Sequence, residues 1–422
     1  MNKIIHKESN DLNAEKIRFI LYLAFVFLLP FDKFFSTLTL YAIILTTIID
    51  YKSIKFTRIP KSFWIFQIPI LLSLTGYLYS DFKSEGGFLI ERQLAFLIFP
   101  ILIPLSLSYI NKERRNAIFN AFANGTTTAI GYLLIILTSK MTNDALYLSS
   151  KSYFNHDFSA PIGIHSSYLS IYTSISIIYL QTQLIKKEAP KKILTFIKLI
   201  ILCIGLLFLA SRNVIITTFF ITGFIFPSYY LRKKVTYIIL FSVLTISVVL
   251  LVVKNVSYIS QRFTVLLIED ITINNRNDDT NQHFHLEHNE PRIKRWALSK
   301  QIIAESPIIG HGTGDEIPLL KEAYYDNNLI VSYANELNIH NQYLSIIIKH
   351  GIIGLLFFLF FMFYNLKLSI NTKDYLYLAT IILIASSFIT ENILDSNKGI
   401  FFVSLFLTFC GYYSIKKANS KN

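Results

Sequence analysis

Long apolar runs separated by short polar gaps recur along almost the whole chain. Each run is close to the roughly 20 residues that an α-helix needs to cross the hydrocarbon core of a bilayer. The runs are continuous, whereas the strands of a membrane β-barrel are short and alternate between apolar and polar positions. The pattern therefore predicts an all-α polytopic membrane protein. We expect about twelve transmembrane helices, at roughly 17–32, 35–50, 62–80, 93–110, 117–138, 163–184, 193–210, 213–230, 235–253, 341–365, 374–390 and 399–415.

The longest polar interval, residues 254–340, divides the chain. It separates nine expected helices in 1–253 from three in 341–422. Asn, Asp and His are frequent around 274–290, so we expect a weakly ordered connector there. The organisation is thus two sets of membrane helices joined by one large loop that contains short helices.

One helix of this loop is predicted from Pro291 to Ser306. Proline is favoured in the first turn of a helix, and Pro307 follows the expected end. Helical spacing allows one apolar face, formed by Ile293, Trp296, Ala297 and Ile303.

The composition supports a membrane protein. Hydrophobic residues make up 53% of the chain and charged residues only 16%, where a soluble domain has roughly a quarter charged. Cys203 and Cys410 both fall in expected spans, so no disulfide framework or zinc motif is indicated. The first span, near Ile17, has no cleavage site after it, and we expect it to be retained.

The net charge of +13 follows from topology. Lys and Arg collect in alternate gaps between the spans, as the positive-inside rule requires of cytoplasmic loops. Both termini are therefore expected in the cytoplasm and the 254–340 loop outside, and no nucleic-acid partner is needed. The basic residues expected inside are Lys52, Lys55, Arg58, Lys61, Lys112, Arg114, Arg115, Lys186, Lys187, Lys191, Lys192, Arg232, Lys233, Lys234, Lys367, Lys373, Lys416, Lys417 and Lys421.

Three arginines are candidate ligands for an anion. Arg212 interrupts an apolar stretch and is expected at the outer turn between two spans, either as a snorkelling residue or as an anion ligand. Arg292 and Trp296 lie one helical turn apart, and Arg295 can point nearly the same way. A guanidinium fork suits a phosphate, since it offers two parallel hydrogen bonds. The alternative is a basic face against lipid headgroups.

Two further segments flank the re-entry of the loop into the membrane. Gly310 and Gly312 permit a sharp turn or a close approach of backbone to ligand. His340 and Asn341 stand just before the tenth span, at the expected water–lipid boundary. Histidine is a natural general base near neutral pH, although a single interfacial histidine is usually structural.

Other polar residues at the outer ends of spans are weaker candidates. His165 either lines the same cavity or caps a helix, and Glu91 and Glu391 are cavity groups or interfacial anchors. The segment that carries His283, His285 and His288 is too polar to preorganise a metal site, and we expect no metal there.

The order of these motifs resembles the O-antigen ligase and polymerase family. The resemblance extends over about 200–400 and includes an upstream Ser-Arg motif and an acidic residue before the last helix. The matching residues are Ser211 and Arg212, Arg292 and Trp296, Pro307 with Gly310 and Gly312, His340 to Leu344, Gly351 with Gly354, the segment His165 to Ser170, and Glu391.

This resemblance implies an enzyme that moves a glycan from undecaprenyl pyrophosphate to an acceptor hydroxyl on the periplasmic side of the bacterial inner membrane. His340 would be the catalytic base, and Arg212 and Arg292 would bind the pyrophosphate. Contacts to the substrate would come from a second group of residues. No metal or other cofactor is expected, and a single displacement would invert the anomeric carbon. The second group is Trp296, Gly310, Gly312, Asn341, His165, Glu391 and Arg295.

The sequence leaves several alternatives open. The acceptor is expected to be lipid A core, as for a ligase, but a second lipid-linked repeat or a protein hydroxyl would make the chain a polymerase or an O-oligosaccharyltransferase. From a different class, a transporter, a flippase or a non-catalytic scaffold would also be polytopic. Transporters usually show internal repeats and broken helices at the midplane, which this sequence does not show clearly.

Overall fold

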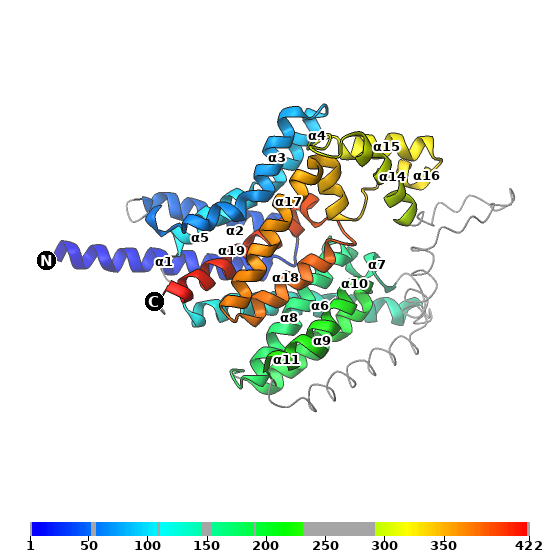
Figure 1. Cartoon of the computed structure of the whole chain (residues 1–422). Helices are drawn as coiled ribbons and strands as arrows, with labels where there is room; N and C mark the ends of the chain where they lie inside the picture. Colours follow the sequence, from blue (N-terminus) through cyan, green and yellow to red (C-terminus); the bar gives the residue numbers. More distant parts are fainter. Residues whose placement is uncertain are drawn as a thin grey trace.

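The computed structural model describes residues 2–51, 56–107, 110–144, 153–189, 191–230 and 292–419 (Figure 1). These residues are built from helices and connecting turns, with no strand among them. The fold class predicted from the sequence is therefore confirmed as all-α. The span expected at 235–253, the connector around 274–290 and the histidines 283, 285 and 288 lie outside the described residues.

Within each described range the helices follow one another with short connections. In chain order they are α1 (Asn2–Leu28), α2 (Lys33–Ile49), η2 (Phe56–Arg58), η3 (Lys61–Gln67), α3 (Ile68–Tyr79), α4 (Lys83–Gln93), α5 (Ala95–Ser106), α6 (Lys112–Asp144), α7 (His156–Ser159), η5 (Ala160–Ile162), α8 (Ser166–Ile185), α9 (Lys192–Leu209), α10 (Arg212–Phe220), the π-helical η6 (Ile221–Ile225), α11 (Phe226–Tyr230), α14 (Arg292–Glu305), α15 (Glu316–Asp326), α16 (Ile330–Ala334), α17 (Gln342–Asn371), α18 (Tyr375–Ser387), η7 (Ile393–Asp395) and α19 (Asn397–Asn419).

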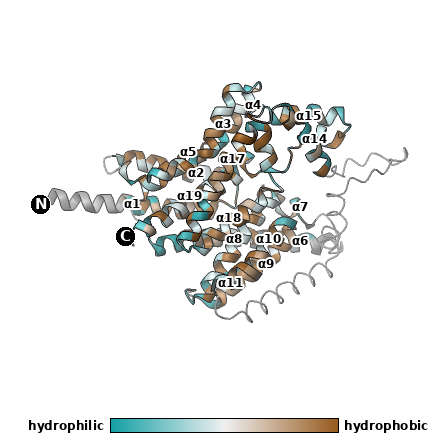
Figure 2. Ribbon diagram, viewed as in Figure 1, coloured by the Kyte–Doolittle hydropathy of each residue, from teal (hydrophilic) through white to brown (hydrophobic). Residues whose placement is uncertain are grey.

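Within the described residues, seven helical stretches are long and apolar enough to cross a membrane. Two shorter apolar helices, α2 and α18, coincide with predicted spans. The spans expected at 17–32 and 163–184 fall largely on α1 and α8, which are not among the seven. Figure 2 shows the hydrophobic colour along the long helices. The seven stretches are Lys61–Tyr79, Lys83–Ser106, Lys112–Lys140, Lys192–Leu209, Arg212–Tyr230, Gln342–Asn371 and Asn397–Asn419.

Basic residues gather at one end of the helices. There Arg115 of α6 pairs with Asp374, which caps α18, and Lys112 Nζ lies 2.6 Å from a carboxylate oxygen of Glu188. Both chain termini lie towards this side of the molecule, away from α14–α16 (Figure 1). Three of the basic gaps, around Lys112, Glu188 and Asp374, thus meet at one end of the described structure.

At the opposite end, the N-terminal ends of α8, α10, α14 and α17 meet the segment 388–396 that connects α18 to α19. We call this region the loop end. Hydrogen bonds join these elements directly: Ser167 of α8 contacts Glu391, Asn213 of α10 contacts Thr390, and the backbone N–H of Gln342 donates to the Phe388 carbonyl at 2.8 Å. The candidate residues lie around this junction.

Helix α8 is the most hydroxyl-rich of the long helices and is buried along nearly its whole length. Its serines and threonines donate to carbonyls one turn earlier, for example Ser170 to Ser166 at 2.8 Å and Thr173 to Leu169 at 2.7 Å. These bonds satisfy the hydroxyls within the helix itself, so the side chains can be buried against other helices at little cost. A comparatively polar sequence can therefore form a central helix.

The helices of the loop have a small apolar core of their own. It contains Leu298 and Ile302 of α14 and extends to Ile348 of α17. The apolar face predicted for α14 is confirmed in part: Trp296 and Ile303 pack against this core, whereas Ala297 is exposed and the buried positions also include Arg295. The predicted bounds of this helix, in contrast, agree with Arg292–Glu305 and with its end before Pro307.

Helix α17 is interrupted at Gly351, whose φ of 60° lies in the left-handed region. The segment after α14 packs against this break: His311 N–H donates to the Ile348 carbonyl at 2.9 Å and Gly312 N–H to the Lys349 carbonyl at 3.0 Å. A Cβ on Gly351 would lie 2.1 Å from the Ile308 carbonyl oxygen, and one on Gly310 would lie 2.4 Å from the backbone nitrogen of His350. The glycines of the predicted motif thus permit close packing of backbone on backbone.

We predict that Gly351→Ala lowers the free energy of unfolding by about 2 kcal/mol or more, from the unfavourable φ and the displaced loop together. The apparent unfolding midpoint of the purified protein in detergent measures this. Gly131→Ala in α6 is the matched control, because its Cβ would meet no atom within 4 Å. Equal midpoints for the two variants would contradict the role assigned to the break.

Candidate functional site

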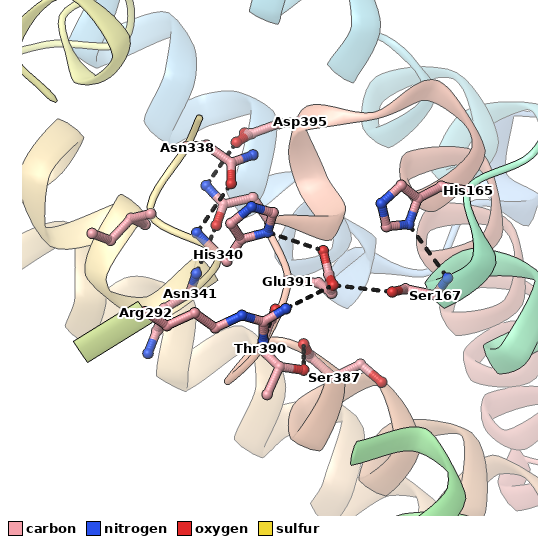
Figure 3. A network of polar contacts seen from close by, with 12 residues as sticks. His165, Ser167, Arg292, Asn338, His340, Asn341, Ser387, Thr390, Glu391 and Asp395 are labelled. Carbon is pink, nitrogen blue, oxygen red and sulfur yellow. Dashed lines mark hydrogen bonds and ion pairs between the residues drawn. The ribbon is translucent and has the colours of Figure 1, made fainter. Parts of the chain in front are cut away.

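Glu391 is the common partner of residues from three other segments at the loop end (Figure 3). Its carboxylate accepts a hydrogen bond from Ser167 Oγ at 3.0 Å. His340 Nδ1 lies 3.4 Å from Oε2, and Arg292 Nη2 lies 3.5 Å from Oε1. The side chain is only 12% exposed. A carboxylate with so little solvent needs such partners, because burying an unpaired charge is costly.

Each of these residues stands at the start of a helix. Ser167 lies in the first turn of α8, Arg292 begins α14, and His340 immediately precedes Asn341, the N-cap of α17. The N-terminal end of a helix carries a partial positive charge from its unpaired N–H groups. The helix ends and the arginine therefore make the loop end favourable for negative charge.

The surroundings of Glu391 keep its carboxyl group ionised. Burial alone would raise the pKa, but the hydrogen bond with His340 and the positive charges of His340 and Arg292 outweigh burial. The resulting pKa is well below the ordinary value of 4.5. Glu391 is thus held in the ionised form, most strongly while His340 carries a positive charge.

His340 adopts a backbone conformation that is unfavourable for a residue with a side chain, with φ of 51°. Its N–H donates to Asn338 Oδ1 at 3.0 Å. With Nδ1 directed at Glu391, the second ring nitrogen, Nε2, is left for another partner. The side chain remains 22% exposed. This arrangement orients a histidine for proton transfer while leaving it accessible.

Arg292 binds the segment around Glu391 through two guanidinium nitrogens. Nη1 donates to the Thr390 carbonyl at 3.0 Å, while Nη2 faces the Glu391 carboxylate. One turn further along α14, Trp296 Nε1 donates to the Ile339 carbonyl at 3.1 Å. Helix α14 therefore contacts both the Glu391 segment and the residue before His340.

The other two arginines differ in their surroundings. Arg212 is partly buried at the first position of α10, and the next residue, Asn213, donates to Ser386 and Thr390. Arg212 thus lies close to the segment that binds Arg292. Arg295 is buried, 3% exposed, with Nη1 3.5 Å from Ser332 Oγ of α16. It faces the interior of the loop helices and not the Glu391 carboxylate.

His165 takes one of the two roles considered for it from the sequence, that of a helix cap. It is the N-cap of α8, where Nδ1 accepts from the Ser167 N–H at 3.3 Å, and Ser167 in turn donates to Glu391. Its ring lies on the same side of Glu391 as Ser167 (Figure 3). Asn341, by contrast, is committed to helix capping: its side chain accepts from the N–H groups of Tyr343 and Leu344.

Gly310 and Gly312 lie where the loop packs on α17 and α3, as described for the break at Gly351. A Cβ on Gly312 would lie 2.4 Å from the Cα of Ser80. Their closest neighbours are therefore other parts of this chain. Glu91, the second acidic candidate, is exposed on α4.

A second buried cluster was not identified from the sequence. Lys349 Nζ lies 2.8 Å from Glu316 Oε2 and 3.0 Å from Asp395 Oδ1, and Asn392 Nδ2 donates to both carboxylates. One signal was available, since an ionisable residue such as Lys349 within an apolar span indicates a buried partner. The partner itself could not be found without the fold, because Glu316 belongs to the loop.

The low pKa of Glu391 predicts a defined pH dependence of stability. A depressed pKa means that the ionised carboxylate stabilises the fold above the ordinary value of 4.5, and that this contribution is lost as pH falls through the lower folded-state pKa. From pH 8 to pH 5, the free energy of unfolding of Glu391→Gln should therefore be lower than that of the wild type by about 2 kcal/mol. The variant should accordingly unfold at a lower temperature. The deficit should shrink only at pH values below about 4.5.

Unfolding midpoints across this pH range test the prediction, with Glu91→Gln as the control. Glu91 is exposed, and its replacement should leave the midpoint almost unchanged. A deficit that disappeared near neutral pH would show that Glu391 is not a stabilising anion.

A search of curated proteins finds no match. A family model described as O-antigen ligase matches residues 197–359, a region that contains Arg212, Arg292 and His340 but not His165 or Glu391. The resemblance inferred from the motifs is thereby confirmed: over residues 197–359, this chain matches the O-antigen ligase family.

Proposed function

We propose that this protein transfers a glycan from an undecaprenyl-pyrophosphate donor to an acceptor hydroxyl at the loop end. The observation that carries the proposal is the convergence of Arg292 and His340 on the buried Glu391, at helix N-termini that favour anions. The family match over the segments that contain both residues supports it independently. Membrane helices would hold the lipid of the donor.

In this proposal His340 is the general base. Glu391 orients the imidazole through Nδ1, and Nε2 takes the proton of the acceptor hydroxyl as its oxygen attacks the anomeric carbon of the donor glycan. A new carbon–oxygen bond forms while the bond from that carbon to the pyrophosphate oxygen breaks. The electron pair leaves with undecaprenyl pyrophosphate, and a single displacement inverts the carbon.

Arg212 and Arg292 are proposed to bind the pyrophosphate. Negative charge grows on this group as the bond breaks, so fixed cations close to it stabilise the transition state more than the ground state. Arg292 retains N–H groups beyond those directed at Thr390 and Glu391. The remaining sequence candidates would act around this pair: His165 and Glu391 directly beside it, and Trp296, Asn341, Gly310, Gly312 and Arg295 as residues that hold the segments in place.

The proposed setting is the bacterial inner membrane, with both termini in the cytoplasm and residues 254–340 in the periplasm. Helices at 1–253 and 341–422 would enclose the membrane part of the site. The gathering of basic residues at the end opposite the loop helices supports this orientation. The concentration of polar contacts at the loop end favours an enzyme over a transporter, whose substrate site would lie near the midplane.

His340→Ala should lower glycan transfer by about 10²-fold or more, because a positioned base contributes at least that much. Arg292→Ala should lower it by a similar factor, and Arg292→Lys should fall between, since lysine keeps the charge but not the planar fork. Transfer is measured with purified protein and a lipid-linked glycan donor, and normal membrane insertion is verified for each variant.

Lys294→Ala is the matched control, since Lys294 is an exposed cation on the same helix. Its transfer should equal that of the wild type. Normal transfer by a well-expressed His340→Ala protein would remove the general base from the mechanism.

The acceptor is proposed to be lipid A core, which would make the protein a ligase. The surface glycans and lipid-linked intermediates of a strain without the protein distinguish the alternatives. Loss of long glycan from lipid A, with polymer accumulating on undecaprenyl pyrophosphate, would indicate a ligase. Single repeats still attached to lipid A would indicate a polymerase. An unchanged lipopolysaccharide profile would exclude both and direct the search to exopolysaccharide or protein glycosylation.

A further inference from the structure

Asn392, one residue after Glu391, takes part in a closed ring of polar contacts that are buried except at Asp395, whose side chain is 20% exposed. Its Nδ2 donates to Asp395 Oδ2 at 2.9 Å and to Glu316 Oε1 at 3.3 Å. Lys349 Nζ contacts the other oxygens of the same two carboxylates, Glu316 Oε2 at 2.8 Å and Asp395 Oδ1 at 3.0 Å. Lys349 and Asn392 thus alternate with the two acids around the ring.

This ring fixes the orientation of the Asn392 amide. Two carboxylates require the NH₂ group on their side, so the carbonyl oxygen must point away from them. There Oδ1 accepts from the backbone N–H of Asn341 at 2.8 Å. Asn392 is 2% exposed and Asn341 is 9% exposed, so this bond has little competition from water.

The bond joins the two segments that carry the candidate catalytic pair. Asn341 directly follows His340, and Asn392 directly follows Glu391. A single buried hydrogen bond, one residue away on each side, therefore sets the separation between the imidazole and the carboxylate. Figure 3 shows Asn341 and Asp395 on the same side of Glu391 as His340.

The ring also connects this pair to the loop helices. Glu316 is the first residue of α15, and it accepts a further bond from Ser345 Oγ of α17 at 2.5 Å. Lys349 lies beside the break in α17 where the loop packs. Because Glu316 contacts both α17 and Asn392, the packing of α15 on α17 also affects the position of Asn392.

We propose that Asn392 is a positioning residue for the His340–Glu391 pair, held in register by Glu316, Lys349 and Asp395. This inference rests on the proposed function. It assigns no contact between Asn392 and substrate. The role is to keep the base and its carboxylate in contact against the strain of the His340 backbone.

Hydrogen exchange and glycan transfer, measured on the same purified protein, test this proposal separately. In Asn392→Ala, amide exchange should accelerate in residues 338–345, because the Asn341 N–H loses its acceptor. Transfer should fall by about tenfold or more, with the KM for the donor changed less than about twofold, as expected for a misplaced base with an intact anion site.

Asn365→Ala is the matched control. Asn365 is also fully buried in α17, where it accepts from Tyr377 OH and donates to the Phe361 carbonyl. Its loss should destabilise the protein without accelerating exchange in 338–345 and without the selective loss of turnover. A fall in transfer that only tracks the amount of folded protein, in both variants alike, would overturn the positioning role.

Exchanging the amide of Asn392 with the carboxylate of Glu316 tests whether the lost transfer can be restored. Asn392→Asp alone places a third carboxylate beside Glu316 and Asp395, and transfer should fall as in the alanine variant. Adding Glu316→Gln restores the net charge of the ring and supplies an amide donor on the Glu316 side, while the new aspartate still accepts from the Asn341 N–H. Asp395 still faces the new aspartate without a donor between them, so the double variant should recover part of the lost turnover. Failure to recover while exchange returns to normal would overturn the proposal.

The two readouts separate this inference from the proposed function. Unchanged exchange at 338–345 in Asn392→Ala overturns the hydrogen-bond connection itself. Faster exchange with unchanged transfer overturns its catalytic relevance. Faster exchange in a protein whose wild type and His340→Ala forms are equally inactive supports the connection and contradicts the glycan-transfer function.

Discussion

The loop end is organised around one buried charge, the carboxylate of Glu391. Removing a carboxylate from water costs several kcal/mol unless cations and hydrogen-bond donors replace the lost hydration. Arg292, His340 and Ser167 supply these partners, and each comes from a different element. The requirement to satisfy one anion therefore brings α8, α14, the entry to α17 and the connection to α19 together.

A second buried network lies directly beside the first, and the two divide the segment 391–395 between them. Glu391 faces the imidazole and the guanidinium, whereas Asn392 and Asp395 face Glu316 and Lys349. Helix α14 is held through the first network and α15 through the second. The loop helices are thus fastened at two points, and their own core of Leu298, Ile302 and neighbours adds apolar contact to α17.

Much of the helical framework follows from local sequence. The apolar runs that predicted spans at 62–80 and 399–415 coincide with Lys61–Tyr79 and Asn397–Asn419, because length and hydropathy alone require a helix in lipid. The end of α14 could also be predicted from the sequence, because Pro307 cannot continue the helix.

The contacts between segments that are distant in the sequence were harder to predict. Glu391 was a candidate from its position, but its pairing with His340, fifty-one residues earlier, depends on how α17 and α18 pack. Arg295 illustrates the same limit. Its spacing from Arg292 suggested that both arginines share a face of the helix, yet Arg295 lies with Leu298 and Ile302 on the buried face of α14. Spacing gives the angle of a side chain on its helix, whereas the neighbouring elements decide whether that angle faces solvent, ligand or core.

The segment from His340 to Leu344 shows how a short motif divides its tasks. Asn341 uses its side chain to cap α17 and its N–H to reach Asn392. Tyr343 OH donates to the Ala385 carbonyl at 2.9 Å, and Leu344 packs against the loop core. The contacts of Asn341, Tyr343 and Leu344 thus fix the backbone of this segment. His340, with its left-handed φ, is the residue that these contacts constrain, and its imidazole contacts Glu391 through Nδ1. An unfavourable backbone conformation at one residue is tolerated where several surrounding contacts fix the same conformation. The capping bonds of Asn341 and the packing of Tyr343 and Leu344 are therefore what hold His340 in its unfavourable backbone conformation.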